Sequence, residues 1–319
     1  MVPPTRTFAV VSRLALTGGM LSAAACGLPA QTTQPQEYAD VPVAVTTLKD
    51  VRIDEASGIV ASRRHPGHYY LHNDSGDEPR VFLIDRQGET RATIRLKGVR
   101  AVDCEDIAVA PGRDDGTFDV CLADIGDNNA RHANVRIYRF PEVALPERAR
   151  ETLVVEPLVY RLRYAEGPVN AEAFAVHPQT GDGYIFTKSY DGRGSAVYKL
   201  PAPWDAARET VLRKVGELNL PPALVPMRVV TGADIRSDGQ RLAIRCYGTG
   251  WEWRMAPDAA HTDFDQLFSA SPVQLTMPPE RQGEALCYSA DGAALLTVGE
   301  GRLPTLWELR TALPTGAGR

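Results

Sequence analysis

Oxygen-bearing side chains recur at one position of a segment that repeats along this 319-residue chain. In four copies the residue stands two places before the first large apolar residue of a predicted strand, and these residues are Ser57, Glu105, Glu172 and Glu284. A further copy has Ala233 there, with Thr231 as a substitute if the strand bulges. Converging carboxylates repel one another unless one is protonated or a cation binds. Because Ca²⁺ takes about six to eight oxygen ligands, Thr231 and the other four predict an axial Ca²⁺ site. The alternative is that the acids lie at solvated strand ends and bind backbone amides.

A second group of polar side chains stands where the following strands end. Its members are His72, Asn73, Asp74, Asp124, Lys188, Arg245 and Glu300. Lys188 and Arg245 fall at matching places in neighbouring copies, and such cations beside a metal site suit a phosphate or carboxylate. If a reaction occurs, we expect Lys188 and Arg245 to stabilise developing charge and Asp74 or Asp124 to orient water. The alternative is that each cation only neutralises one of the acids.

Other chemistries lack the residues or the spacing. His68 and His72 lie on an extended strand where four residues span about 13 Å, so they cannot share a zinc ion. The chain has no Gly-x-Ser-x-Gly, P-loop or dinucleotide-binding pattern. A net charge of −5 gives no basic footprint for nucleic acid. Residues 124–129 lack the alternating acids of an EF-hand and are predicted to form a bent loop.

An internal repeat supplies the elements that must position these residues. Five segments share a small or acidic lead-in, an apolar strand, a turn rich in Gly, Pro or Asp, and a second apolar strand. The turn residues tolerate positive φ or preset a bend, as hairpins require. The second strands are expected at residues 69–72, 118–123, 184–187, 241–245 and 294–298.

Two further strands follow in most copies. Third strands are expected at residues 81–85, 135–140, 196–200, 251–254 and 306–309, and fourth strands at 90–96, 153–164, 210–218 and 272–277. The last copy ends after three strands, and residues 41–48 would supply its fourth. This pattern predicts an all-β fold over residues 41–319, a five-bladed β-propeller with four-stranded blades closed by an N-terminal strand. Six blades and a two-sheet sandwich are the alternatives. In a propeller the first strands line the channel, so the candidate residues would meet at one mouth.

The beginning of the chain reads as a targeting segment. Residues 1–25 have a basic start followed by an apolar stretch that is too short to span a bilayer, as in a signal peptide. The stretch ends in Ala-Ala-Ala before Cys26, which favours a lipidated cysteine on a polar tether, residues 26–40. We therefore expect an exported, cell-envelope lipoprotein that contacts the membrane only through its lipid anchor. Cleavage at an Ala-x-Ala site, giving a secreted protein, is the alternative.

Four cysteines follow the tether. They are Cys104, Cys121, Cys246 and Cys287. An even number in an exported chain permits disulfides, and Cys246 and Cys287 fall on neighbouring copies of the repeat. Four buried thiols are the alternative.

Six phrases together resemble a family of uncharacterised secreted bacterial β-propeller proteins that is common in actinobacteria. They are His72-Asn-Asp-Ser-Gly, Cys104-Glu-Asp-Ile-Ala, Asp124-Ile-Gly-Asp-Asn, Glu172-Ala-Phe-Ala-Val, Thr231-Gly-Ala-Asp-Ile and Gln282-Gly-Glu-Ala-Leu. The resemblance covers roughly residues 50–310. It implies a propeller and export, and no activity.

A more distant similarity is to the five-bladed calcium-activated nucleotidases, or apyrases. Ser57, Glu105, Glu172 and Glu284 resemble four positions at which that family holds a channel Ca²⁺. The similarity implies hydrolysis of nucleoside di- and triphosphates, although the copy with Ala233 and Thr231 departs from the pattern. Phytase-like and esterase-like propellers are similar more distantly.

Two functions are consistent with these residues. In the first, the protein binds a cell-envelope ligand, a protein or an anionic small molecule at the channel mouth, with any Ca²⁺ structural. In the second, it is a Ca²⁺-dependent hydrolase of phosphate esters or similar anionic substrates, in which the metal positions water. The first is favoured because no nucleophile or general base has a signature of its own. The sequence therefore leaves open whether the protein is an enzyme.

Overall fold

The computed structural model describes residues 41–190, 194–256 and 259–310. The chain divides into two compact units, residues 1–36 and 37–319, and all described residues belong to the second. The predicted signal peptide, the lipidation site Cys26 and the tether therefore lie outside the described residues. Within the described ranges, no helix is long and apolar enough to cross a membrane.

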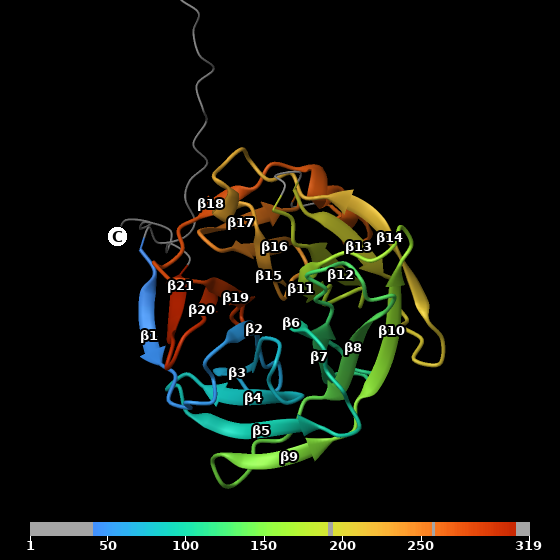
Figure 1. Ribbon diagram of the computed structural model, residues 1–319. Helices are drawn as coiled ribbons and strands as arrows, with labels where there is room; N and C mark the ends of the chain where they lie inside the picture. Colours follow the sequence, from blue (N-terminus) through green and yellow to red (C-terminus); the bar gives the residue numbers. More distant parts are fainter. Residues whose placement is uncertain (1–40, 191–193, 257–258, 311–319) are drawn as a thin grey trace, which may run out of the picture. The chain divides into compact units, whose positions relative to one another are not determined.

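Five antiparallel hairpins form the centre of the fold (Figure 1). Their inner strands are β2 (Ala56–Ala61), β6 (Cys104–Pro111), β11 (Ala171–Val176), β15 (Val230–Ile235) and β19 (Gly283–Tyr288). Their second strands are β3 (His68–Asn73), β7 (Phe118–Asp124), β12 (Gly183–Thr187), β16 (Arg241–Cys246) and β20 (Ala294–Gly299). In the last two turns, Gly239 and Gly292 have φ of +69° and +71°, a conformation that glycine adopts readily. The predicted inner hairpins are confirmed.

The inner strands stand in a closed ring. Each contacts the next in chain order, and β19 contacts β2. Figure 1 shows these five strands around the middle of the view, with the other strands further out. A radial arrangement of sheets around a central channel is a β-propeller.

The outer strands complete the sheets. The third strands are β4 (Arg80–Asp85), β8 (Val135–Pro141), β13 (Ala196–Leu200), β17 (Thr249–Arg254) and β21 (Thr305–Arg310). The outermost strands are β5 (Thr90–Leu96), β10 (Leu158–Tyr164), β14 (Thr210–Glu217), β18 (Val273–Leu275) and β1 (Val43–Thr47). As predicted, β1 pairs antiparallel with β21, so the beginning of the described chain completes the last sheet.

One predicted strand is divided in the structure. Residues 153–164 were expected to form a single strand, but they belong to β9 (Glu151–Val155) and β10. Pro157 lies between them and has no N–H to donate to a ladder. As a result β9 extends the first sheet parallel to β5, while β10 pairs with β8 and, in parallel, with β14.

Apolar side chains fill the spaces between successive sheets. One of the five clusters joins β11, β12 and β13 to β15, β16 and β17, and includes Phe186 and Trp253. The 3₁₀ segment η2 (His261–Ser269) adds Phe264 and Phe268 to this cluster, whereas the other such segment, η1 (Val225–Met227), buries none of its residues.

The four cysteines of the described chain form no disulfide. Cys104, Cys121, Cys246 and Cys287 are buried free thiols, which was the alternative to disulfide pairing.

Candidate metal centre at the channel mouth

Each inner hairpin contains a β-bulge near the start of its inner strand. In the second hairpin Cys104 pairs with Asp124 and Asp106 pairs with Ala123, so Glu105 has no partner in the ladder. A bulge bends the strand and re-aims the unpaired side chain. The same shift occurs in all five hairpins, and the bulged residues are Ser57, Glu105, Glu172, Thr231 and Glu284.

The bulge in β15 identifies the residue that matches the others in the fourth hairpin. Thr231 is the unpaired residue there, because the register shifts between Val230 and Gly232. Ala233 pairs with Ile244 and holds the apolar position that Ile107 holds on β6. The assignment of Ala233 to the position of the acids was therefore wrong, and the substitute Thr231 occupies it.

The two bulged hydroxyls tie neighbouring inner strands together. Ser57 donates a hydrogen bond to the backbone oxygen of Glu105 (2.7 Å), and Thr231 donates one to the backbone oxygen of Gly283 (3.1 Å). Both side chains are buried. Ser57 and Thr231 thus bridge strands, whereas the three bulged glutamates supply carboxylates.

Glu105 is a buried carboxylate beside other acids. Only 3% of the residue is exposed, and a side chain at Gly126 would begin 2.1 Å from Glu105 Oε1, so the glycine makes room for it. Burial and repulsion from Glu172 and Asp74 raise the pKa of Glu105 well above its ordinary value. Burial and the charge of Asp74 likewise raise the pKa of Asp103 to about 6. Ionised carboxylates are therefore unfavourable here without a cation.

Glu284 has a similar environment on the other side of Asp74. It is 4% exposed. Burial, with repulsion from Glu300 and Asp74, raises its pKa to about 9. Burial also raises the pKa of Glu300. Glu284 is hydrogen-bonded to the carboxyl group of Glu300, and Glu105 to that of Glu172, so the partners of both buried glutamates are themselves acids.

Glu172 differs because it has a cationic partner. Lys188 Nζ lies 2.8 Å from Glu172 Oε2, and Asn170 donates to Glu172 Oε1 (3.1 Å). The Lys188 ammonium also lies 5.2 Å from the ring centroid of Tyr247. Burial lowers the pKa of Lys188, but the charge of Glu172 outweighs burial, so the pKa lies above its ordinary value. Lys188 is therefore a fixed positive charge beside the acids.

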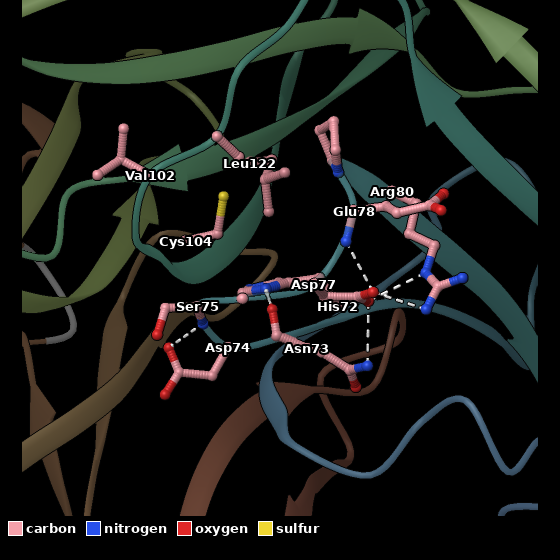
Figure 2. A pocket seen from close by; sticks show the side chains of 13 residues that line it. His72, Asn73, Asp74, Ser75, Asp77, Glu78, Arg80, Val102, Cys104 and Leu122 are labelled. Atoms are coloured by element: carbon pink, nitrogen blue, oxygen red, sulfur yellow. Dashed lines mark hydrogen bonds and ion pairs between the residues drawn. The ribbon is translucent and has the colours of Figure 1, made fainter.

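Asp74 is held between Glu105 and Glu284 by the loop that follows β3. Its N–H donates to the backbone oxygen of Glu55 (2.8 Å), and its Oδ1 accepts from the N–H of Ser75 (2.5 Å). Figure 2 shows the bonds that fasten the rest of this loop, which join Asp77 to Asn73, Glu78 and Arg80. The same loop lines the pocket drawn in Figure 2, together with Val102, Cys104 and Leu122.

The carboxylate of Asp124, which was expected to orient water, instead accepts hydrogen bonds from backbone N–H groups. Its Oδ1 accepts hydrogen bonds from the N–H groups of Val102 (3.0 Å) and Asp103 (2.7 Å), and its Oδ2 accepts one from the hydroxyl of Tyr138 (2.8 Å). The carboxylate thus fixes the chain that leads into β6. Of the two aspartates, Asp74 therefore belongs to the carboxylate groups at the mouth and Asp124 does not.

Arg245 and Lys188 do not occupy equivalent positions in their hairpins. Arg245 pairs with Gly232, the residue after the bulge, just as His72 pairs with Gly58, whereas Lys188 follows the last residue of β12. The prediction that Lys188 and Arg245 occupy matching places is therefore wrong. Arg245 is fully buried and donates to Glu280 Oε2 (3.1 Å), and burial lowers its pKa.

Two further buried acids, Asp106 and Asp234, join neighbouring inner strands, and neither was predicted from the sequence. Asp106 is buried and accepts hydrogen bonds from three backbone N–H groups, including that of Phe174 (2.9 Å) on β11. Asp234 accepts from the N–H of Tyr288 (2.8 Å) on β19. Asp106 follows the bulged Glu105 by one place, and Asp234 follows the bulged Thr231 by three. This recurrence of an acid just after the bulge is the sequence signal that could have identified them.

The donor set suits a hard cation. Carboxylate oxygens lie within 4.8 Å of one another in two groups of described residues, Asp74 with Asp103 and Glu105, and Asp74 with Glu284 and Glu300. Both groups contain oxygen ligands alone, which fit Ca²⁺ or Mg²⁺ better than Zn²⁺. Neither group contains all three bulged glutamates, since Glu172, which pairs with Lys188 and is hydrogen-bonded to Glu105, belongs to neither.

The comparisons with known proteins concern the fold. No family model and no curated protein matches the chain. The PQQ-bound aldose sugar dehydrogenase of Streptomyces coelicolor is 11% identical, with a TM-score of 0.49 over 85% of this chain and 97% of that one. The gluconolactonase XC5397 of Xanthomonas campestris is 12% identical, with a TM-score of 0.42 over 77% and 69% of the two chains. Neither is an apyrase or a phytase.

Proposed function

We propose that the channel mouth binds a divalent cation, with Ca²⁺ as the best fit, and through it an anionic ligand. The observation that carries the proposal is the pair Glu105 and Glu284, two carboxyl groups that are 3% and 4% exposed and whose hydrogen-bond partners among the described residues are other carboxyl groups. An uncompensated buried charge costs several kcal/mol, roughly, and a bound cation removes that cost.

Calcium fits better than magnesium because of the shape of the donor set. The carboxylates come from inner strands and loops of different sheets, so they approach from several directions. Ca²⁺ accepts about six to eight oxygens in irregular geometry, whereas Mg²⁺ requires a near-ideal octahedron and keeps several waters. Backbone oxygens and water would complete the shell.

Lys188 supports an anionic ligand. Its ammonium lies at the edge of the acids, paired with Glu172 and stacked on Tyr247. A cation held by carboxylates has open positions toward solvent, and a phosphate or carboxylate there would contact both the metal and Lys188. Binding of such a ligand is the proposed role, and hydrolysis of it is the second candidate.

The finer features expected from the sequence belong to the same proposal. The closed ring of β2, β6, β11, β15 and β19 supports a count of five blades. The signal peptide and lipidation of Cys26 would place the mouth at the cell envelope, where ligands come from outside the cell.

Removal of metal from the full chain tests the proposal. We expect a chelator to lower Tm by several degrees, and Ca²⁺ to restore it at lower concentration than Mg²⁺. Elemental analysis of dialysed protein and calorimetric titration would measure bound Ca²⁺ directly. The proposal fails if the protein binds no Ca²⁺ and its Tm is the same with and without chelator. Calcium-dependent turnover of nucleotides, aryl phosphates or aryl esters in the same samples would establish the hydrolase.

A further inference from the structure

Asp74 belongs to both carboxylate groups at the channel mouth. Its oxygens lie within 4.8 Å of those of Asp103 and Glu105 in one group, and of Glu284 and Glu300 in the other. Because Asp74 is common to both, the two groups hold five carboxylates. A shared carboxylate between two sets of ligands is the arrangement by which proteins bridge two metal ions.

Each group contains its own buried glutamate. Glu105 supplies it in one group and Glu284 in the other, and each is hydrogen-bonded to a further carboxyl group, that of Glu172 or of Glu300. One divalent cation at one group would leave the glutamate of the other group with acids alone around it. Two cations would give each buried glutamate a ligand.

The bridging residue is fixed before any ion binds. The N–H of Asp74 is bonded to the backbone of Glu55, and its Oδ1 to the N–H of Ser75. Asp77, paired with Arg80 at 2.6 Å, fastens the remainder of the loop. A preorganised bridge lowers the cost of ordering the site on binding.

Charge favours the same arrangement. Carboxylates bind a metal in the ionised form, so five such ligands would carry five negative charges, and two divalent cations neutralise four of them. One divalent cation would leave three in a partly buried site, where repulsion between carboxylates is strong.

We propose that the mouth holds two divalent cations, preferably Ca²⁺, bridged by Asp74. One is bound by Asp103 and Glu105, and the other by Glu284 and Glu300. This inference rests on the proposed function, since it requires that the mouth binds cations at all. It adds the number of ions, the division of the ligands between them and the residue that joins them.

The stoichiometry of Ca²⁺ binding to the full chain tests the inference. Equilibrium dialysis and calorimetric titration should give two Ca²⁺ per wild-type chain. Glu300→Gln and Asp103→Asn should each leave one, and Asp74→Asn should weaken both by at least tenfold. Glu156→Gln, an exposed residue on the connection between β9 and β10, is the matched control and should retain two.

The outcomes separate this inference from the proposed function. A single Ca²⁺ per wild-type chain overturns the two-ion site and leaves the cation site standing, whereas no bound Ca²⁺ overturns both. Two ions that persist in Glu300→Gln and Asp103→Asn overturn the assigned ligands. Circular dichroism in chelator checks that each variant is folded, and the wild-type stoichiometry decides the number of ions if a variant is not.

Discussion

The carboxylate of Asp106 on β6 accepts a hydrogen bond from the backbone N–H of Ala233 on β15, two inner strands further along the ring (3.1 Å). The same oxygen accepts the N–H of Phe174 on β11, the strand between them (2.9 Å). One side chain therefore joins three inner strands just below the mouth. Burial raises the pKa of Asp106, although these hydrogen bonds favour the ionised form.

Replacement of Asp106 should show how much this link contributes to stability. Asp106→Ala leaves buried N–H groups on three strands without an acceptor, and each such group costs about 1–3 kcal/mol. We expect the free energy of unfolding to fall by about 3–5 kcal/mol, as measured by urea denaturation. Asp106→Asn keeps one carbonyl oxygen and should cost less. Equal losses in the two variants would show that the hydrogen bonds are not responsible.

Glu284→Gln should change stability in opposite directions with and without calcium. In chelator the variant removes a buried carboxylate that Glu300 and Asp74 repel, so we expect the free energy of unfolding to rise by about 1–3 kcal/mol. With Ca²⁺ it removes a ligand, so the calcium-induced rise in Tm should shrink. Thermal denaturation in both conditions measures the two effects.

Glu147→Gln, in the exposed connection between β8 and β9, is the control for this substitution and should change neither value. A loss of stability in chelator would mean that Glu284 has a favourable partner in the metal-free protein.

Lys188→Met should strengthen cation binding and weaken anion binding. The substitution removes a positive charge 2.8 Å from Glu172, which reduces repulsion of Ca²⁺ and should raise its affinity by roughly tenfold. It also leaves Glu172 buried without its cationic partner, so stability in chelator should fall by about 2–4 kcal/mol. Calorimetry with Ca²⁺, and then with inorganic phosphate in the presence of Ca²⁺, measures both affinities.

Lys199→Met provides a matched control, because Lys199 also pairs with acids, Asp182 and Asp265. Its Ca²⁺ affinity should equal that of the wild type. If Lys188→Met leaves the affinities for Ca²⁺ and phosphate unchanged, Lys188 takes no part in binding either ion.

His177 should make stability depend on pH below neutrality. It is buried, its Nδ1 accepts the N–H of Thr180 (3.2 Å), and burial with the nearby His261 lowers its pKa to about 4. Asp182 and Lys199 also face it. The unfolded chain binds a proton below its ordinary pKa of 6.5 and the native state does not, so stability is lost as pH falls from 6.5 toward 4.

The corresponding variant is His177→Asn, in which an amide oxygen replaces Nδ1 as the acceptor. Between pH 6.5 and 4.5 the wild type should lose about 2–3 kcal/mol more than the variant, by urea denaturation at each pH. Between pH 7 and 8 the difference between the two proteins should stay constant, which serves as the internal control. Parallel curves down to pH 4.5 would contradict the assignment.

Much of the fold could be predicted because its signals are local. Alternating apolar residues and Gly-containing turns define the inner hairpins, and β1 was expected to complete the last sheet, as it does. The division at Pro157 was missed because an apolar stretch on either side of one proline reads as continuous. Arg245 was misassigned because the sequence does not mark where the second strand ends: Arg245 pairs with Gly232 within β16, and the residue that matches Lys188 is Tyr247, two places later.

By itself the sequence determined the all-β class, the inner hairpins and the recurrence of Glu105, Glu172 and Glu284, since hydrophobic period and turn chemistry depend on neighbours along the chain. Only the tertiary structure decided which acids meet. Asp74, from the loop after β3, joins Glu105 and Glu284, while Glu172 lies beside Glu105 and pairs with Lys188. Contacts between side chains on different inner strands depend on the bulges and on how one sheet packs against the next. The spacing of residues along a single strand does not determine the distances between such side chains.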